Sequence, residues 1–230
     1  MLARSNRLDG SGWLALIGGG EFSFGETRDA DAAWLEKTPP GPVAFLPTAS
    51  GSADYATHFS TYVSEALERE PVTVPVYRDR DSRRGKNLER IATAAGVYIG
   101  GGIADTLVEV LAESPALEAL EERVRQGGVV VAIGAAAQAL AARCRSLTGR
   151  DVLTGFAWLP RSAVEVNFDP AHDRRIRAIL DEPGMKWGIG LPSGSALLLG
   201  PDGRLETSGP VMILEEPEGD WKLLQTQSDN

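Results

Sequence analysis

The feature that most constrains the fold is a repeated order of short apolar strand, glycine turn and helix. Residues 129–133 are five consecutive apolar residues preceded by two glycines and followed by one, and an alanine-rich segment with high helix propensity comes next. The largely apolar segments 13–17 and 96–99 each end in three consecutive glycines. Strands that alternate with helices in this way are typical of a parallel sheet covered by helices. The sequence therefore predicts an α/β fold, a three-layer sandwich with a mostly parallel central sheet.

The remaining strands and helices complete this pattern without a linker-like segment. We expect helices at 27–36, 53–68, 87–95, 105–112 and 115–125, and further strands at 42–46 and 72–77. Short strands at 195–199, 204–207, 211–214 and 221–224 predict an antiparallel edge added late to the same sheet. These elements form one domain over residues 13–225, with flexible ends at 1–12 and 226–230.

The composition argues against several classes of function. A net charge of −9 argues against binding to nucleic acid or to a membrane surface. One cysteine and two histidines are too few for an intramolecular disulfide or a typical structural zinc site. The N-terminus lacks the apolar region of a signal peptide, and no segment reaches the roughly 18 apolar residues that cross a bilayer. We therefore expect a cytoplasmic protein with no cofactor, no metal, and no nucleic-acid or membrane partner.

The glycine turns and the corner after residue 133 all follow predicted strands, and ligands bind at the carboxyl ends of strands in open parallel sheets. The first turn, Gly18–Gly20, lacks the third glycine and the acidic residue of a dinucleotide site. The corner itself has the order of a nucleophile elbow, in which Ser or Cys projects from a sharp turn between strand and helix. The predicted corner residue is Ala135, which offers only a methyl group. The simpler alternative is a packing role, with a helix of small residues lying close against a buried strand.

Four motifs in a fixed order give the sequence a resemblance to a known family. They are Leu16–Glu21, Phe45–Ser50, Val97–Gly102 and Val130–Ala136. Together they resemble the cyanophycinase and dipeptidase E family of serine peptidases, over roughly residues 14–214 of this chain. The resemblance implies a flavodoxin-like fold of the class I glutamine amidotransferase type.

The same resemblance implies that the catalytic residues of the family are replaced. Ala135 lies at the position of the serine nucleophile, Asn167 at that of the histidine base, and Ser193 at that of the carboxylate. Ile103 replaces a family glutamine. Without a hydroxyl or thiol at residue 135 no acyl intermediate forms, and an amide takes no proton at neutral pH. The sequence therefore favours a pseudoenzyme, while the question of whether the chain is an enzyme stays open.

An oxyanion hole is expected to survive these replacements, because its donors are backbone N–H groups. The resemblance implies that they belong to Ala136 and to Gly101 or Gly102, near the positive end of the following helix. A peptide or a small acidic ligand is the expected partner of this pocket. The predicted ligand-binding residues are Gly20, Glu21, Gly101, Gly102, Ile103 and Ala136.

Two alternatives remain open. The first is an active hydrolase with relocated residues, in which Ser193 or Ser195 is the nucleophile and His172, oriented by Asp169, is the base. A simpler interpretation of these residues is that they are exposed loop residues and first-turn acids of a helix. The second alternative is a structural or partner-binding protein, a homodimer or other homo-oligomer that keeps the elbow for packing.

Overall fold

The main body of the fold is a seven-stranded sheet, in a computed structural model that describes residues 10–148 and 152–224. The strand order is β11-β10-β1-β5-β4-β2-β3. The parallel strands are β1 (Trp13–Ile17), β2 (Val43–Leu46), β3 (Pro71–Thr73), β4 (Gly96–Ile99) and β5 (Val129–Ile133). Strands β10 (Ala196–Leu199) and β11 (Leu205–Ser208) form an antiparallel edge. The predicted α/β class and mostly parallel main sheet are confirmed.

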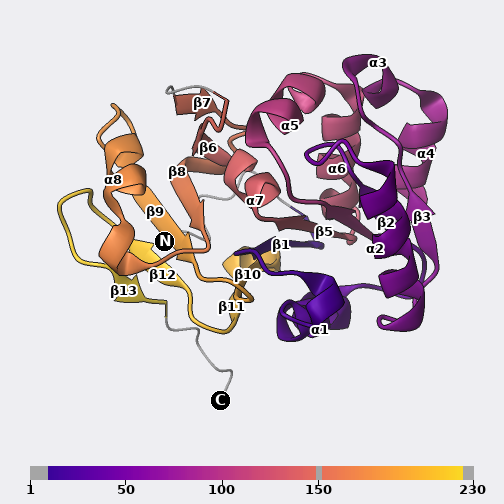
Figure 1. The fold of residues 1–230 in the computed structure, drawn as a ribbon, viewed down its shortest axis with the longest axis horizontal. Helices are drawn as coiled ribbons and strands as arrows, with labels where there is room; N and C mark the ends of the chain where they lie inside the picture. Colours follow the sequence, from indigo (N-terminus) through magenta and orange to yellow (C-terminus); the bar gives the residue numbers. More distant parts are fainter. Residues whose placement is uncertain (1–9, 149–151, 225–230) are drawn as a thin grey trace.

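Helices cover both faces of this sheet, as Figure 1 shows. The helices of the main body are α1 (Arg28–Lys37), α2 (Ala53–Glu65), α3 (Asp79–Ser82), α4 (Gly85–Thr93), α5 (Ala104–Leu111), α6 (Pro115–Arg125) and α7 (Ala135–Ala139). Helix α8 (Arg174–Leu180) packs instead on β8 and β9. Successive residues of a strand point to opposite faces. Leu14 and Leu16 of β1 therefore pack with α5 and α6, whereas Ala15 and Ile17 pack with α1 and α2. All five residues of β1 are buried, as a strand in the middle layer requires.

Side-chain caps explain where two of the helices begin. The Ser114 hydroxyl accepts a hydrogen bond from the Leu117 N–H, and Pro115 lies in the first turn of α6, where its missing N–H costs nothing. The Ser52 hydroxyl accepts from the Tyr55 N–H at the start of α2. The predicted helix 115–125 is confirmed, whereas the helix predicted at 53–68 ends at Glu65.

A second sheet of six strands is the main feature that the sequence does not predict. Its order is β13-β12-β9-β8-β6-β7. The strands are β6 (Ala141–Arg145), β7 (Val152–Thr154), β8 (Leu159–Val166), β9 (Trp187–Leu191), β12 (Met212–Leu214) and β13 (Lys222–Leu223). Of the late strands predicted to extend one sheet, β10 and β11 do so, but β12 and β13 belong to this second sheet with β9. Figure 1 shows it beside the main body, in salmon (β6 to β8), orange (β9) and yellow (β12 and β13), with α8 over it.

The predicted domain limits stay a prediction. Of the predicted flexible segment 1–12, residues 1–9 lie outside the described residues, as does the predicted tail 226–230. Gly12 is held in place, because its N–H donates to the Val124 carbonyl oxygen at 2.9 Å. None of the helices within residues 10–148 and 152–224 combines the length and the hydropathy that a membrane span needs.

Candidate functional site

The strand-to-helix corner has its strained residue at Gly134. Gly134 has φ 59° and ψ −123° and is the N-cap of α7, and Ala135 is already the first helical residue. Residues other than glycine rarely adopt this backbone conformation. A nucleophile elbow holds its Ser or Cys at such a sharp, strained turn. The strained backbone conformation therefore lies one position before Ala135, the residue that the sequence predicts at the corner. Four successive small residues, Gly134 to Ala137, fit either register, so the sequence alone does not fix where the helix begins.

There is room for a side chain at this corner. A Cβ atom added to Gly134 would have the Gly101 Cα, at 4.0 Å, as its nearest neighbour beyond the adjoining residues. The corner is also fixed to the sheet, since the Gly134 N–H donates to the Ile17 carbonyl oxygen at 3.0 Å. Gly134 thus combines the backbone shape of a nucleophile position with the absence of any reacting group.

The corner opens into a cavity of about 550 Å³, which we call the elbow pocket. It lies where carboxyl ends of β4, β5, β6 and β8 meet the loop that leads to α8, in the crevice expected of a parallel sheet. Its lining consists of Gly102, Gly134, Ala135, Gln138, Arg145, Leu147, Glu165, Val166, Asn167, Phe168, Asp169, His172 and Arg175. Both sheets therefore contribute to one site, although the sequence indicates only the first of them.

Asn167 lies in the elbow pocket just beyond β8, so the structure brings it together with the corner. Its φ of 48° is in the left-handed region, which asparagine tolerates better than most residues. Its N–H donates to the Gly18 carbonyl oxygen at 2.7 Å. A Cβ atom at Gly19 would come within 2.4 Å of the Asn167 Oδ1, which explains the need for glycine in this turn. The first glycine turn therefore serves the close approach of the Asn167 loop.

Ser193 and Ser195 are not among the residues that line the elbow pocket. Ser193 is exposed in the loop between β9 and β10. Ser195 is buried, and its hydroxyl donates to the Pro192 carbonyl oxygen at 2.7 Å. The loop itself is near the first glycine turn, since the Gly194 N–H donates to the Gly19 carbonyl oxygen. In this structure neither serine is presented to the cavity that holds Asn167.

The predicted ligand-binding residues are placed unevenly. Gly102 lines the elbow pocket, and Gly101 faces Gly134 from the neighbouring strand end. Ala136 is fully buried inside the turn of α7, and the Ile103 N–H already donates to the Ala49 carbonyl oxygen. Glu21 lines a separate hollow against α2, and Gly20 packs against Glu26 and Thr27. Of the six residues, only Gly102 lies on the pocket surface itself.

Arg145 and Glu165 line the pocket although the sequence does not predict them as site residues. They lie on the adjacent parallel strands β6 and β8, in which Arg143 pairs with Ala163. Arg145 and Glu165 each lie two residues further along their strand, so the same register places them side by side. Burial raises the pKa of Glu165, while the positive charges of Arg145 and Arg175 act in the opposite direction. The Arg145 Nε and the Glu165 Oε2 are buried and have no hydrogen-bond partner among the described residues. The sequence gives no sign of strand β6, because the alanine-rich segment before Arg145 predicts a longer helix, whereas α7 ends at Ala139.

His172 and Asp169 form the second polar group of the pocket. The His172 Nδ1 lies 2.8 Å from the Asp169 Oδ2, so the predicted orientation of this histidine by Asp169 is confirmed. The Asp169 Oδ1 also accepts from the Ala171 N–H at 2.9 Å. This backbone bond and the His172 bond lower the pKa of Asp169. Both side chains are well exposed, so the pair lies at the mouth of the cavity.

The wall of the pocket at Leu147 is held by Asp105 at the start of α5. The Asp105 carboxylate accepts from the Leu147 N–H at 2.9 Å, from the Thr148 hydroxyl at 2.6 Å and from the Ser146 hydroxyl. Partial desolvation alone would raise the pKa of Asp105, but these bonds outweigh it and lower the pKa to about 2. One carboxylate therefore orders the loop after β6.

We expect Asp105→Asn to lower the free energy of unfolding at pH 7, with a loss that shrinks as the pH falls toward 2. A carboxyl whose folded pKa lies below its ordinary value of 3.8 stabilises the fold above that value and loses this effect as the pH falls through about 2. Urea unfolding at several pH values measures the loss. Asp54→Asn, in the first turn of α2, is the matched control. Equal losses in the two variants at every pH would exclude the Asp105 hydrogen bonds as the cause.

The elbow pocket offers groups that bind and polarise, but no hydroxyl, thiol or amine side chain among the residues described as lining it. Its polar side chains are guanidinium, carboxylate, imidazole and amide groups. No group of three or more His, Cys, Asp or Glu residues within residues 10–148 and 152–224 is arranged to hold a metal ion. The described lining therefore offers no Ser, Thr, Cys or Lys side chain as a nucleophile.

Comparison with known proteins agrees with this architecture. The sequence model of peptidase family S51 matches residues 14–202 of the chain. Among solved structures, a peptidase from an acI-B1 actinobacterium superposes with a TM-score of 0.73 at 20% identity, covering 95% of this chain and 96% of that one. A candidate peptidase E protein from Listeria monocytogenes EGD-e superposes with a TM-score of 0.63 at 15% identity, covering 86% and 98%. A comparison with curated proteins found no match. At these identities the two structures show a shared fold.

Proposed function

The chain belongs to peptidase family S51, and we propose that it is a catalytically inactive member that binds a peptide or a small acidic ligand in the elbow pocket. The observation that carries the proposal is Gly134, which lies at the strained corner where a nucleophile elbow holds its Ser or Cys. Asn167, in the same cavity, has an amide that cannot act as a base at neutral pH. Without a nucleophile and its base, a serine hydrolase loses several orders of magnitude in rate.

The charges of the elbow pocket support the proposed ligand class. Arg145 and Arg175 line the cavity, and a guanidinium group matches a carboxylate with two parallel hydrogen bonds. Glu165 beside Arg145 can accept from an amide N–H or an ammonium group. A cavity of about 550 Å³ is within the range of small-molecule sites. A short peptide that carries an acidic side chain presents all of these groups.

Binding of aspartyl dipeptides should weaken about tenfold in Arg175→Gln, because one charge-assisted hydrogen bond in a partly exposed site contributes about 1.5 kcal/mol. Isothermal titration calorimetry of the purified chain measures this change. Arg174→Gln is the matched control, since Arg174 is the adjacent exposed arginine of α8 and does not line the cavity. Equal affinity in both variants, or no binding of any dipeptide or small dicarboxylate to the wild-type chain, would contradict the proposed ligand.

Lack of catalysis has its own test. The wild-type chain should neither hydrolyse the dipeptides nor react with a fluorophosphonate probe, because no lining side chain described here carries a hydroxyl or thiol. Mass spectrometry of the probe-treated protein gives the site of any labelling. Labelling of one specific serine in the folded chain would overturn the proposal of inactivity while leaving the ligand class intact.

An active hydrolase with relocated residues is the second candidate, and one observation favours it. The Asp169 carboxylate holds the His172 ring at 2.8 Å, as a base with its orienting group would be held. Against it stand the exposed position of Ser193 and the bond from the buried Ser195 hydroxyl to Pro192. If this candidate is right, dipeptide hydrolysis will be measurable and His172→Gln will abolish it, whereas His58→Gln on α2 will not.

A further inference from the structure

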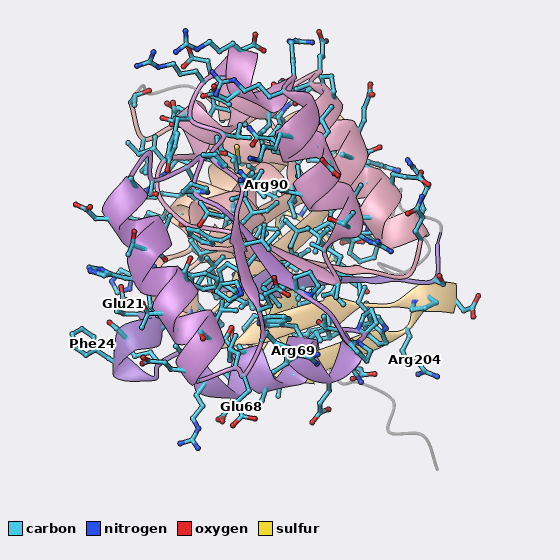
Figure 2. All side chains as sticks on the ribbon, turned by 90° about the vertical axis from the view of Figure 1, so that its right-hand side faces the viewer. Glu21, Phe24, Glu68, Arg69, Arg90 and Arg204 are labelled. Carbon is cyan, nitrogen blue, oxygen red and sulfur yellow. The ribbon has the colours of Figure 1, made fainter. Side chains whose placement is uncertain are left out.

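Phe24 is presented to solvent on the side of the molecule formed by α1 and α2. Its side chain is 82% exposed, the highest fraction among the large apolar side chains of residues 10–148 and 152–224 that are exposed at all. Figure 2 shows Phe24 at the outer edge of the molecule, next to Glu21. A single exposed apolar residue is ordinary on a protein surface, so its meaning depends on what surrounds it.

The loop that carries Phe24 is tightly held. Phe22, two residues earlier, is buried, and its ring centroid lies 5.0 Å from Tyr62, 5.3 Å from Phe59 and 5.7 Å from Tyr55. The short helix η2 (Phe22–Phe24) is capped at its end by Gly25, whose N–H donates to the Phe22 carbonyl oxygen. An aromatic side chain on a fixed backbone loses little conformational entropy when it binds.

Two hollows flank this loop. The first, which we call the aromatic groove, has a volume of about 520 Å³. Four aromatic residues line it, together with polar side chains and one alanine: Phe22, Phe24, Tyr55 and Tyr62, with Glu21, Ser23, His58, Thr61, Glu65 and Ala66. The second has a volume of about 580 Å³ and extends from Phe22 and Tyr62 to Arg28. A projecting aromatic side chain and an aromatic groove that could receive one therefore lie on the same surface.

We propose that a second copy of this chain covers this surface, in a two-fold symmetric dimer in which Phe24 of each copy inserts into the aromatic groove of the other. A two-fold axis pairs the same patch of the two copies. Each Phe24 side chain is then buried by the partner, and each aromatic groove is filled. The partner's Phe24 then stacks on Tyr55 and Tyr62, and aromatic anchors in pockets are typical hot spots of interfaces.

The charges around the patch fit the same arrangement. Arg28 follows Phe24 by four residues on the exposed start of α1, and Glu65 lies in the wall of the groove that receives the phenyl ring. Neither side chain forms an ion pair with another described residue, and both are exposed. Inserting Phe24 brings Arg28 of one copy toward Glu65 of the other, and the symmetry makes this contact twice. The pair thus gives the interface a complementary charge pattern.

Sedimentation equilibrium of the full chain tests the dimer. We expect a concentration-dependent dimer, and we expect Phe24→Ser to raise its dissociation constant at least about thirtyfold, because the loss of one hot-spot side chain already has that effect and each dimer loses two. Phe24 is exposed, so the change leaves the core intact. Leu223→Ser is the matched control, because Leu223 is a 55% exposed apolar residue on β13 in the other sheet. A wild-type chain that is monomeric up to about 1 mM, or a dimer that Phe24→Ser leaves unchanged, would overturn the proposal.

A charge exchange separates this dimer from any other use of the groove. Arg28→Glu places like charges opposite each other in both symmetric contacts, and Glu65→Arg does the same, so each variant alone should be monomeric. An equimolar mixture of the two variants should recover the dimer as a heterodimer, since both contacts then join opposite charges. If the mixture stays monomeric, or if each variant alone dimerises as the wild type does, Arg28 and Glu65 do not face each other. Binding of a foreign aromatic peptide with no self-association would assign the groove to that partner instead.

Discussion

Changing Gly134 to Ser together with Asn167 to His should give a chain that a fluorophosphonate probe labels at residue 134. The corner already has the φ and ψ of a strained elbow, and a Cβ atom there meets nothing closer than the Gly101 Cα at 4.0 Å. The new hydroxyl would therefore project into the elbow pocket, where residue 167 also lies. Histidine at residue 167 supplies the base that asparagine cannot be.

The size of the expected effect follows from the role of the base. Gly134→Ser alone should react slowly, and the added histidine should accelerate labelling by about 10²–10⁴-fold, the usual contribution of general base catalysis. Serine in this backbone conformation costs about 1–3 kcal/mol, so thermal unfolding must show that each variant stays folded at the assay temperature. The rate of probe incorporation, measured by mass spectrometry of the intact protein, is the readout.

Ala135→Ser with the same Asn167→His change is the matched control for the register of the elbow. Ala135 is the first residue of α7 and only 7% exposed, so a hydroxyl there is poorly placed to react. Faster labelling at residue 135 than at residue 134 would show that Ala135, and not Gly134, occupies the nucleophile position, as the sequence predicts. Rapid labelling of Gly134→Ser without the histidine would show that another group, such as His172, already serves as base.

The sequence predicts the main sheet well because its strands carry a local signal. Five apolar residues between glycines, as in β5, leave few other conformations, and the glycine turns mark where each strand ends. The convergence of the second glycine turn with the elbow follows from the rule for parallel sheets, and Gly102 and Gly134 do line one cavity. The rule for parallel sheets thus leads from local patterns to the expectation that these two segments meet.

The parts that the sequence does not predict depend on contacts far apart in the chain. Residues 141–145 follow an alanine-rich helix and have no strong strand pattern, yet they pair with β8 as strand β6. Missing β6 also meant missing Arg145 and its neighbour Glu165, which supply charge to the pocket. The register of the elbow has no sequence signal for a different reason, since only the backbone angles distinguish Gly134 from Ala135 as the strained residue.

Asp31→Ala should lower the free energy of unfolding by about 3–5 kcal/mol, because it leaves buried donors without an acceptor. Asp31 is fully buried on α1, and its carboxylate accepts from the Thr27 hydroxyl at 2.6 Å, the Trp34 Nε1–H at 2.8 Å and the Tyr62 hydroxyl at 2.8 Å. The Tyr62 bond joins α1 to α2. Urea unfolding of the variant with an unchanged m-value measures the loss.

Asp31→Asn is the matched control, and its effect should depend on pH. The asparagine Oδ1 still accepts from the Trp34 Nε1–H, and its NH₂ group can donate to the hydroxyls of Thr27 and Tyr62. The substitution should therefore lower the free energy of unfolding by about 1 kcal/mol or less at low pH. Burial raises the pKa of Asp31 despite the opposing hydrogen bonds. Because this pKa is raised, Asp31 makes its full contribution to the free energy of unfolding below pH 3.8. Part of that contribution is lost as the pH rises through the pKa that Asp31 has in the folded state. The asparagine variant has no such loss, so its stability relative to the wild type should increase between pH 3 and pH 7. A difference that stays constant over this range would show that Asp31 is not held at a raised pKa.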